Sequence, residues 1–381
     1  MVLQVFDYIC LCCSAAIAGI HVALAVGIIL NRWRDLSTVE RASERELSVS
    51  VVIPARDEEE GLPTLLASLK RQTMAGFETV LVDDRSSDRT AEMMEEYKSH
   101  DPKHVVVVHN KEEPREMNGK QHALEIGLQA ATGDIVLLTD SDCDLPSEWV
   151  QLMSAYFQDD RVGAVFGQVV PKAQATFFER FQSFDQLLIN QWSSGTAGLG
   201  VATSCFGNNF ACRKTALSEI GGFKGLGFTL VEDAALISAL ANQTKWRIRV
   251  STSPRAIIHP AAQTTWKDFL IQHTRWTEGA FYHPDWVPRQ EYRFVVLFLV
   301  ASLIALPFGI LHPFLLILSA ASFFSVALMG LLAGLLYAAQ RRYFLRYVPY
   351  TIFFMFFYSL TVVLGMLAVP VAWKGSKLKE Q

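Results

Sequence analysis

The sequence lacks both of the glycine-rich loops with which many nucleotide-binding enzymes hold phosphate groups. No Gly-x-Gly-x-x-Gly follows the first predicted strand, and no Gly-x-x-x-x-Gly-Lys-Ser/Thr occurs in the 381 residues. These absences argue against a Rossmann dehydrogenase and against a P-loop enzyme. A bound phosphate group would therefore be neutralised by a metal ion or by basic side chains. Lys120, at the start of a predicted helix, is one candidate, although a lysine on a solvated helix face is an equally ordinary interpretation.

Cysteine pairs and excess basic charge are also missing. The six cysteines show no metal-type spacing, and Cys10, Cys12 and Cys13 lie together in an apolar segment. We therefore expect neither a disulfide framework nor a zinc site. The formal net charge of −4 gives no basic face of the kind that binds nucleic acid, so no nucleic-acid partner is expected.

Charged residues are absent from Tyr8 to Leu30, which is long enough for one helix to cross a bilayer. Arg32 and Arg34 follow directly, whereas a secretory signal carries its positive charge before the apolar run. The sequence thus predicts an uncleaved N-terminal anchor over residues 1–34, with its C-terminal side in the cytoplasm.

A second apolar region, 293–373, predicts about three more spans, at 294–312, 314–338 and 348–372. The Arg-rich loop 340–346 then falls on the cytoplasmic side, as the positive-inside rule requires, whereas the lysines of the tail 374–381 fall on the other side. We expect a multi-pass membrane protein with a cytoplasmic catalytic domain, in the plasma membrane if bacterial, and a span count accurate to within one.

The middle of the chain, 47–285, alternates short β-branched runs with helical segments. This alternation, with runs such as Val105–Val108 that are apolar on both faces, predicts an α/β domain with a doubly wound parallel sheet. The expected pairs of strand and helix are 48–53 with 61–72, 77–82 with 88–98, 104–109 with 119–131, and 134–139 with 147–157.

Acidic residues follow three of the predicted strands. In such a sheet, ligands bind at the carboxyl ends of the strands, so these acidic groups are expected at one edge. Asp140, Asp142 and Asp144 alternate along the chain, and on an extended segment their side chains would point the same way and repel one another unless a cation compensated them. Carboxylates without His or Cys suit Mg²⁺ or Mn²⁺, which proteins usually hold together with substrate phosphates.

The motifs of the middle segment, in their order, resemble the membrane-anchored family 2 glycosyltransferases. The resemblance covers about residues 48–282. It rests on "VSVVIPARDEEEGL", "VLVDDRSSDRT", "NGKQHALEIGLQAATGDIVLLTDSDCD", "GNNFACRKTALSEIGGF", "LVEDAALISAL" and "QHTRW". It implies a GT-A fold, which binds nucleoside-diphosphate sugars.

The resemblance also implies roles for residues at the sheet edge. Asp142 would coordinate the metal that bridges two donor phosphates, and Asp140 would face the ribose. Asp84 and the loop Pro54–Glu58 would complete the pocket for the base. Arg56 and Arg85 stand where the family commonly has Asn and Gly, and no ligand role is carried over to either.

Sugar transfer needs a base for the acceptor hydroxyl and positive charge near the leaving group. Asp233, of the Glu-Asp pair, is the candidate base; taken alone, it is also an ordinary helix N-cap. Gln272, Arg275 and Trp276 would share one face of a helix over 265–281. Arg275 can pair with the departing diphosphate and Trp276 can stack against the acceptor, although Trp and Arg are also typical of an interfacial amphipathic helix.

These observations predict an inverting, metal-dependent transferase that moves a sugar, from a donor expected to be a UDP-hexose, to a lipid or other membrane-associated acceptor. A processive polysaccharide synthase, acting on a growing glycan, is the alternative within the family, but about four spans leave little room for a translocation channel. A silent nucleotide-sugar sensor is disfavoured by the joint presence of Asp142, Asp233 and Arg275. A transporter is disfavoured because the spans lack intramembrane charges.

Overall fold

The computed structural model describes residues 2–39, 47–114, 116–171, 175–336, 348–367, 372–373 and 376–377. Two compact units make up the chain. We name them the sheet unit (Leu30–Ala173 and Gly200–Ala262) and the helical unit (Met1–Ile29, Gln174–Leu199 and Gln263–Gln381). The predicted basic loop at 340–346 and most of the predicted tail lie outside the described residues.

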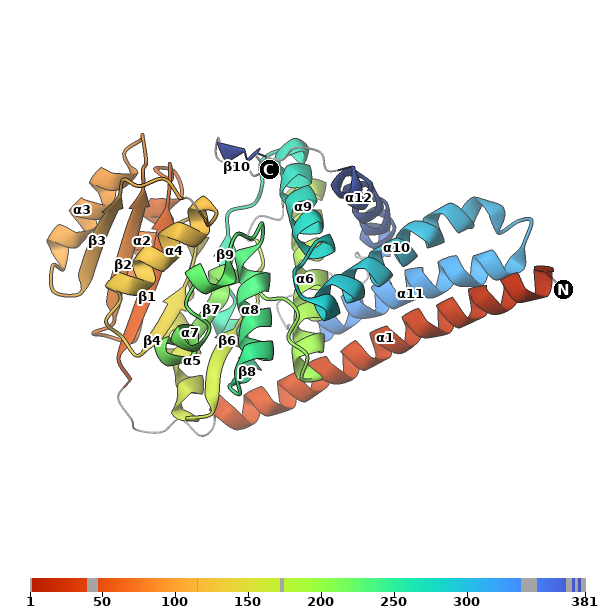
Figure 1. Cartoon of the computed structure of the whole chain (residues 1–381), viewed down its shortest axis with the longest axis horizontal. Helices are drawn as coiled ribbons and strands as arrows, with labels where there is room; N and C mark the ends of the chain where they lie inside the picture. The colour runs from red at the N-terminus through yellow and green to blue at the C-terminus, as the bar shows by residue number, and fades with distance from the viewer. Residues whose placement is uncertain are drawn as a thin grey trace. The chain divides into compact units, whose positions relative to one another are not determined.

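A seven-stranded sheet in the order β3-β2-β1-β4-β7-β6-β8 forms the centre of the sheet unit (Figure 1). Its strands are β1 (Val49–Ala55), β2 (Glu78–Asp84), β3 (Val105–Asn110), β4 (Ile135–Leu138), β6 (Val162–Phe166), β7 (Phe210–Arg213) and β8 (Arg247–Val250). The four predicted strands, β1 to β4, pair in parallel with one another, as expected. However, β7 runs antiparallel to both β4 and β6, so the sheet is mixed.

Helices cover this sheet and lie close to the predicted positions. They are α2 (Leu62–Lys70), α3 (Thr90–His100), α4 (Gly119–Ala130), α5 (Trp149–Ala155), α7 (Lys214–Glu219) and α8 (Glu232–Gln243). Helix α4 packs against β1, β2 and β3. Its Gly127 allows a close approach, because a Cβ there would lie 2.4 Å from Cγ1 of Val52.

The core of the sheet unit lies between the sheet and the helices. Ile53, Leu137, Trp149 and Phe157 belong to it and are fully buried. Burying a side chain of this size contributes about 1.5–3 kcal/mol. Because β1 and β4 are anchored in this way, the residues that follow them are held at one edge of the sheet.

Three local predictions are wrong in detail. Val106–Val108 are not buried on both faces, because β3 is an edge strand. Pro54 is not in the loop after β1 but is a buried residue of that strand, paired with Val82. Asp140, Asp142 and Asp144 do not share an extended segment, since the chain turns at residues 141–142, and only Cys143–Asp144 forms a short strand, β5. This strand pairs with β9 (His259–Pro260).

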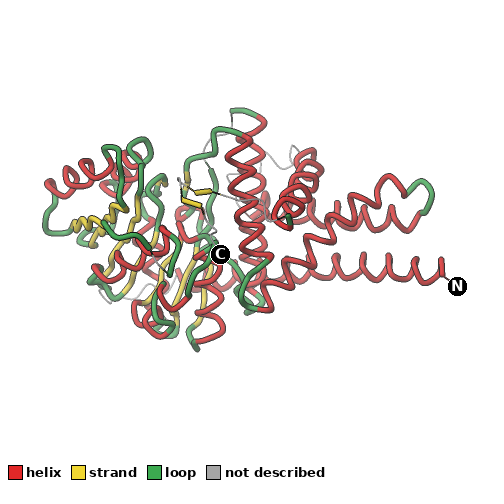
Figure 2. Tube along the Cα trace, turned by 45° about the horizontal axis from the view of Figure 1, so that its top comes forward, coloured by secondary structure: helices red, strands yellow, loops and turns green. Residues whose placement is uncertain are grey.

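The helical unit consists of long helices, with the short strands β10 (Ala372–Trp373) and β11 (Ser376–Lys377) near the end of the chain (Figure 2). The helices are α6 (Phe177–Gly198), α9 (Trp266–Phe281), α10 (Trp286–Phe308), α11 (Pro313–Leu336), α12 (Val348–Met366) and most of α1 (Val2–Val39). The predicted domain 47–285 therefore corresponds only in part to the sheet unit, because α6 and α9 group with the apolar helices.

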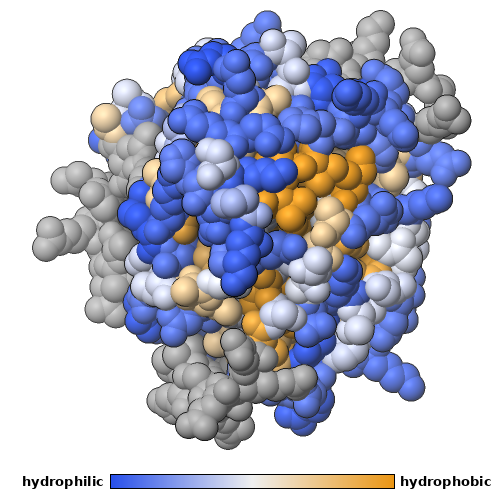
Figure 3. Space-filling view, turned by 90° about the vertical axis from the view of Figure 1, so that its left-hand side faces the viewer, coloured by the Kyte–Doolittle hydropathy of each residue, from blue (hydrophilic) through white to orange (hydrophobic). Residues whose placement is uncertain are grey.

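Three helices among the described residues are long and apolar enough to cross a membrane: Val5–Asp35, Trp286–Phe308 and Pro313–Leu332. The fourth expected span contains a shorter apolar helix, Tyr350–Gly365. Exposed apolar side chains such as Ile304 and Phe324 occur on these helices. The face of the molecule that Figure 3 shows is, by contrast, mainly hydrophilic, with hydrophobic side chains gathered in a central patch.

Close helix packing and ring contacts hold the helical unit together. A Cβ on Gly27 of α1 would lie 2.0 Å from the carbonyl oxygen of Gly195 of α6, so only glycine allows this crossing. The ring centroids of Phe269 and Phe357 are 5.0 Å apart and join α9 to α12. Such aromatic pairs add about 0.5–1.5 kcal/mol beyond the burial of their surface.

Candidate active site

Lys120 lies at the centre of the carboxylates that gather at the carboxyl edge of the sheet. Its Nζ is 2.7 Å from Oδ1 of Asp140, which follows β4, and 3.2 Å from Oε1 of Glu232, the first residue of α8. Burial by itself lowers the pKa of Lys120, but the charges of Asp140 and Glu232 outweigh burial and raise that pKa above its ordinary value. The Lys120 side chain therefore stays charged and ties two distant segments together.

The start of α4 also holds the segment that leads to Glu232. Asn118 and Gln121 form a capping box at this helix end. Nε2 of Gln121 donates to the carbonyl oxygens of Phe223 (2.8 Å) and Gly227 (2.6 Å). Nδ2 of Asn118 donates to the carbonyl oxygen of Thr229 (2.7 Å). One helix N-terminus thus positions both the lysine and the approach to α8.

Asp142 is a partly buried carboxylate in a turn, and its negative charge is poorly compensated. Burial, together with the charges of Asp140 and Glu58, raises the pKa of Asp142 to about 7. A Cβ on Gly61 would lie 2.9 Å from Oε2 of Glu58 and 3.2 Å from Cβ of Asp142, so Glu58 and Asp142 approach each other across this glycine. Two carboxylates in such an arrangement favour a positive ligand.

Asp233 is the second residue of α8, so it is not the N-cap, a position held by Val231. Its Oδ2 accepts a hydrogen bond from the backbone N–H of Gly207 (3.0 Å), and its Oδ1 accepts one from the N–H of Ala234 (2.8 Å). Burial and the charge of Glu232 raise the pKa of Asp233 to about 6. A carboxylate with a raised pKa in a fixed orientation is suited to accept a proton near neutral pH.

The donor set fits a hard divalent cation that is completed by a ligand. Among the described residues, no group of three or more His, Cys, Asp or Glu side chains could hold a metal by itself. Mg²⁺ and Mn²⁺ are commonly held by one or two carboxylates together with phosphate oxygens. Asp142, with its raised pKa and with Glu58 nearby, is the side chain that best meets this need.

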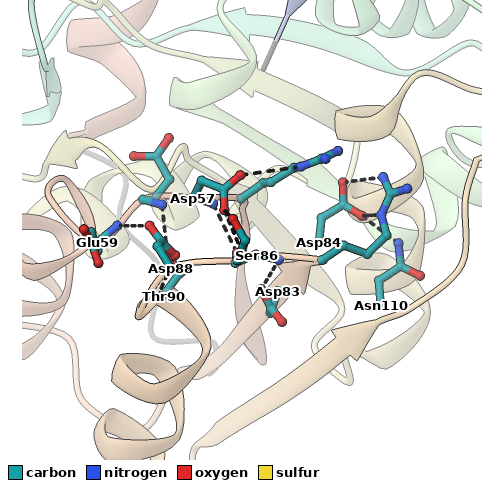
Figure 4. Close-up of polar contacts among 12 residues, drawn as sticks. Asp57, Glu59, Asp83, Asp84, Ser86, Asp88, Thr90 and Asn110 are labelled. Atoms are coloured by element: carbon teal, nitrogen blue, oxygen red, sulfur yellow. Dashed lines mark hydrogen bonds and ion pairs between the residues drawn. The ribbon is translucent and has the colours of Figure 1, made fainter. Parts of the chain in front are cut away.

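The loops after β1 and β2 are joined by hydrogen bonds (Figure 4). Oδ1 of Asp57 accepts from the backbone N–H of Ser87 (2.7 Å), and the N–H of Asp57 donates to Oγ of Ser86 (3.1 Å). The N–H of Glu59 donates to Oδ2 of Asp88 (3.0 Å). The two loops that the sequence assigns to the nucleotide therefore support each other.

Asp83 and Asp84 face different partners. Asp83 accepts from the N–H of Ser86 (3.1 Å) and contacts Nδ1 of His109 (3.2 Å). Asp84 is 3% exposed, and its Oδ1 accepts from Nδ2 of Asn110 (2.7 Å). Of the predicted nucleotide residues, Glu58 and Asp140 follow strands, Asp84 is the last residue of β2, and Lys120 lies at the start of α4. Pro54, by contrast, lies within β1.

Asp144, the third carboxylate of its motif, pairs with a basic side chain. Its Oδ1 is 3.0 Å from Nη2 of Arg71, the residue that follows α2. The charge of Asp144 is therefore balanced locally.

Gln272, Arg275 and Trp276 lie on α9, as predicted, and all three are partly exposed. They belong to the helical unit, whereas the proposed base and metal ligand belong to the sheet unit. Within α9 the buried positions are Phe269, His273, Thr274, Thr277 and Glu278.

Sequence reasoning missed four residues of this site: Arg85, Asn110, Gly207 and Glu232. Asn110, Gly207 and Glu232 contact predicted residues that are distant in sequence, namely Asp84, Asp233 and Lys120. Arg85 contacts its sequence neighbour Asp84 but was given no ligand role. Glu232 carried the clearest signal, because it adjoins the proposed base in a Glu-Asp pair.

Comparisons with known proteins indicate the family and the fold. Residues 50–221 match the family model described as Glycosyl transferase family 2. "Probable glycosyltransferase YdaM" of Bacillus subtilis is 29% identical over 261 residues, which cover 66% of this chain and 58% of that protein. Beta-monoglucosyldiacylglycerol synthase of Trichormus variabilis is 26% identical over 273 residues, covering 70% and 54%.

Undecaprenyl-phosphate 4-deoxy-4-formamido-L-arabinose transferase of Pectobacterium carotovorum is 40% identical over 124 residues, which cover 31% of this chain and 36% of that protein. The chain thus spans less than two thirds of the length of these three relatives. A mannosyltransferase of Pyrobaculum calidifontis, solved with GDP-mannose and Mn²⁺, shares the fold with a TM-score of 0.56 and 19% identity, covering 93% of this chain and 99% of that one. We conclude that residues 50–221 form a family 2 glycosyltransferase domain and that the sheet unit has the GT-A fold.

Proposed function

We propose that this protein transfers a single sugar, with inversion, from a nucleoside-diphosphate sugar to a lipid-type acceptor. The observation that carries the proposal is the arrangement around Lys120. Asp140 and Glu232 pair with this lysine, while Asp142 and Asp233 have raised pKa values at the same sheet edge. One carboxylate is thus set to bind a cation and another to accept a proton.

Direct displacement needs one base. The acceptor hydroxyl oxygen attacks the anomeric carbon, the bond from that carbon to the phosphate oxygen breaks, and the nucleoside diphosphate leaves with the electron pair. Asp233 accepts the hydroxyl proton, while Gly207 and Ala234 hold its carboxylate in place. A single displacement inverts the anomeric centre, so we expect an α-linked donor to give a β-linked product.

Asp142, with Glu58 nearby, would hold Mg²⁺ or Mn²⁺ together with the donor phosphates. When bound, this cation supplies positive charge that stabilises the departing diphosphate. Lys120 keeps Asp140 oriented toward the nucleoside side and Glu232 beside the base. Since the structural neighbour was solved with GDP-mannose, GDP donors belong in the test beside UDP donors.

A lipid-type acceptor is supported by two observations. Relatives with similar sequences are named for a diacylglycerol glycolipid and for undecaprenyl phosphate. Among the described residues, three helices are long and apolar enough to cross a membrane, so a lipid substrate would lie in the same membrane as the protein. We propose that the catalytic site faces the cytoplasm and that Gln272, Arg275 and Trp276 act on the acceptor and the leaving group.

The test is the mass of the product. The detergent-purified full chain is incubated with UDP- and GDP-sugars, Mn²⁺ or Mg²⁺, and a lipid extract of the host membrane. We expect a lipid heavier by one sugar, with a β linkage by NMR, and none after chelation of the metal. A polymer ladder would instead indicate the processive synthase, and a retained α linkage would contradict direct displacement.

A matched pair of variants tests whether a loss of binding is specific to the carboxylate assigned to the metal. Asp142→Asn should weaken binding of both Mn²⁺ and the donor, because it removes the carboxylate assigned to the metal. Asp144→Asn should leave both nearly unchanged, because Asp144 pairs with Arg71 instead. Equal behaviour of the two variants would contradict the metal assignment.

A further inference from the structure

Arg85, in the loop after β2, has a backbone conformation that usually belongs to glycine. Its φ is 62°, and Asp57, in the loop that bonds to this one, has a φ of 51°. An L residue adopts such angles only where the surroundings enforce them, and positions of this kind gather at functional sites. Here a long charged side chain occupies a position where the backbone would favour glycine.

The guanidinium of Arg85 is held in one orientation. Its Nε is 3.0 Å from Oδ1 of Asp84 and its Nη2 is 3.2 Å from Oδ2, so the two planar groups pair edge to edge. Its Nη1 is 2.8 Å from Oε1 of Glu113. Within the part of the chain that the structure describes, these contacts engage three of the five guanidinium N–H groups, and two are left for a ligand.

The position of the pair relates Arg85 to the proposed donor site. A Cβ on Gly119 would lie 3.5 Å from Oδ2 of Asp84 and 3.9 Å from Nη2 of Arg85. The next residue of α4, Lys120, pairs with Asp140. The Arg85 guanidinium therefore lies at the same helix start as the proposed donor-binding cluster.

Glu113 is a weak competitor for the guanidinium. Its side chain is 87% exposed, whereas that of Arg85 is 16% exposed. A surface ion pair of this kind contributes little, so a ligand can replace Glu113 at Nη1 without a large penalty. Asp84, by contrast, is buried and also hydrogen-bonded to Asn110, and it keeps the Arg85 guanidinium in place.

We propose that Arg85 is a specificity-determining residue that contacts the nucleobase of the donor; this inference rests on the proposed function. An arginine only donates hydrogen bonds, so it favours a base edge that carries carbonyl oxygens. Uracil has two carbonyl oxygens and guanine has one, whereas adenine has none. Arg85 thus selects UDP and GDP over ADP, and Asp84 serves mainly to aim it.

The experiment is equilibrium binding to the detergent-purified full chain in Mn²⁺, with UDP, GDP, ADP and inorganic pyrophosphate as the probes. Arg85→Gly fits the local backbone, and Arg85→Lys keeps the positive charge but lacks the planar guanidinium. We expect Arg85→Gly to weaken binding of UDP and GDP by about tenfold or more, and that of ADP and pyrophosphate by less than about twofold. Arg85→Lys should give an intermediate loss.

Arg89→Ala is the matched control, because Arg89 is 74% exposed, pairs with Glu92 and lies four positions further along the same loop. It should change no affinity. Unchanged or tighter binding of UDP to Arg85→Gly would overturn the inference, as would an equal loss for UDP and pyrophosphate. If the wild-type protein binds none of the four probes, the proposed function itself fails, which is a different result.

Discussion

The two units of this protein bury charge in different ways. In the sheet unit, carboxylates from three segments gather at the sheet edge that holds Lys120; they are Glu58, Asp140, Asp142, Glu232 and Asp233. In the helical unit, one histidine meets one aspartate: Nε2 of His273 is 2.8 Å from Oδ2 of Asp185, and both side chains are 1% exposed. Surplus negative charge favours a cationic ligand, whereas a balanced pair joins two elements of the fold.

The geometry of the balanced pair supports this distinction. Nδ1 of His273 lies 2.9 Å from the carbonyl oxygen of Phe269, so both ring nitrogens face oxygen acceptors. The ring thus bridges the Asp185 side chain and the backbone of α9. The pair joins α9 to α6 and thereby fixes the helix that carries Gln272, Arg275 and Trp276.

The largest expected effect concerns the proposed base. Asp233→Asn keeps an oxygen for the Gly207 or Ala234 N–H but cannot accept the hydroxyl proton. We expect transfer to fall by about a thousandfold, with UDP affinity changed by less than about twofold, because general bases contribute 10²–10⁴-fold. Initial rates and UDP binding measure the two quantities. The control is Asp134→Asn, because Asp134 is an exposed carboxylate just before β4. An active Asp233→Asn enzyme would show that Asp233 is not the base.

The next effect concerns stability in the helical unit. Asp185→Leu leaves the buried His273 without its partner, and breaking a buried pair in this way costs roughly 3–5 kcal/mol. We expect a lower unfolding temperature for the full chain, with UDP binding by the folded protein unchanged.

A double variant sharpens this comparison. Asp185→Leu combined with His273→Leu removes both members of the pair and should recover much of the lost stability, since apolar replacement of a buried pair is often neutral. If Asp185→Leu abolished UDP binding without lowering the unfolding temperature, the pair would have a ligand-binding role, and the contrast between the units would be wrong.

A smaller effect is expected at Lys120, which lies among the carboxylates of the sheet edge. Lys120→Met removes the only charge that the structure pairs with both Asp140 and Glu232 within the described residues. Repulsion among the carboxylates should then weaken binding of UDP in Mn²⁺ by about tenfold, in line with hydrogen bonds to charged groups. Lys70→Met, at an exposed position of α2, is the control. Unchanged UDP affinity would mean that Lys120 does not organise the donor site.

Local patterns predicted much of the sheet unit, whereas contacts distant in sequence did not follow from them. The β-branched runs and helical periodicity placed the first four strands and their helices to within a few residues, because both signals come from neighbouring positions. The antiparallel β7, between β4 and β6, could not be predicted in this way, since strand pairing depends on segments far apart in the chain.

The same limit applies to the candidate site. The motifs indicated Asp84, Lys120, Asp140, Asp142 and Asp233 as chemistry-bearing residues. The alternation of Asp140, Asp142 and Asp144 was misleading, because it assumed an extended backbone where the chain turns. The contact of Lys120 with Glu232, and that of Arg85 with Asp84, depend on side-chain packing that a motif does not encode.

The smallest predicted effect is a pH dependence that distinguishes Asp142 from Asp233, the two carboxylates with raised pKa values. The pKa of Asp233 is raised to about 6 by burial and by Glu232, and the base acts only when deprotonated. In saturating Mn²⁺, which keeps Asp142 ionised, kcat/KM should therefore be constant above pH 7 and fall below pH 6, approaching about tenfold per pH unit. Lowering the Mn²⁺ concentration should add a second loss near pH 7, because protons then compete with the metal at Asp142. A profile without the limb near pH 6 in saturating Mn²⁺ would show that the base titrates elsewhere, and the surplus negative charge at the sheet edge would then serve the cation alone.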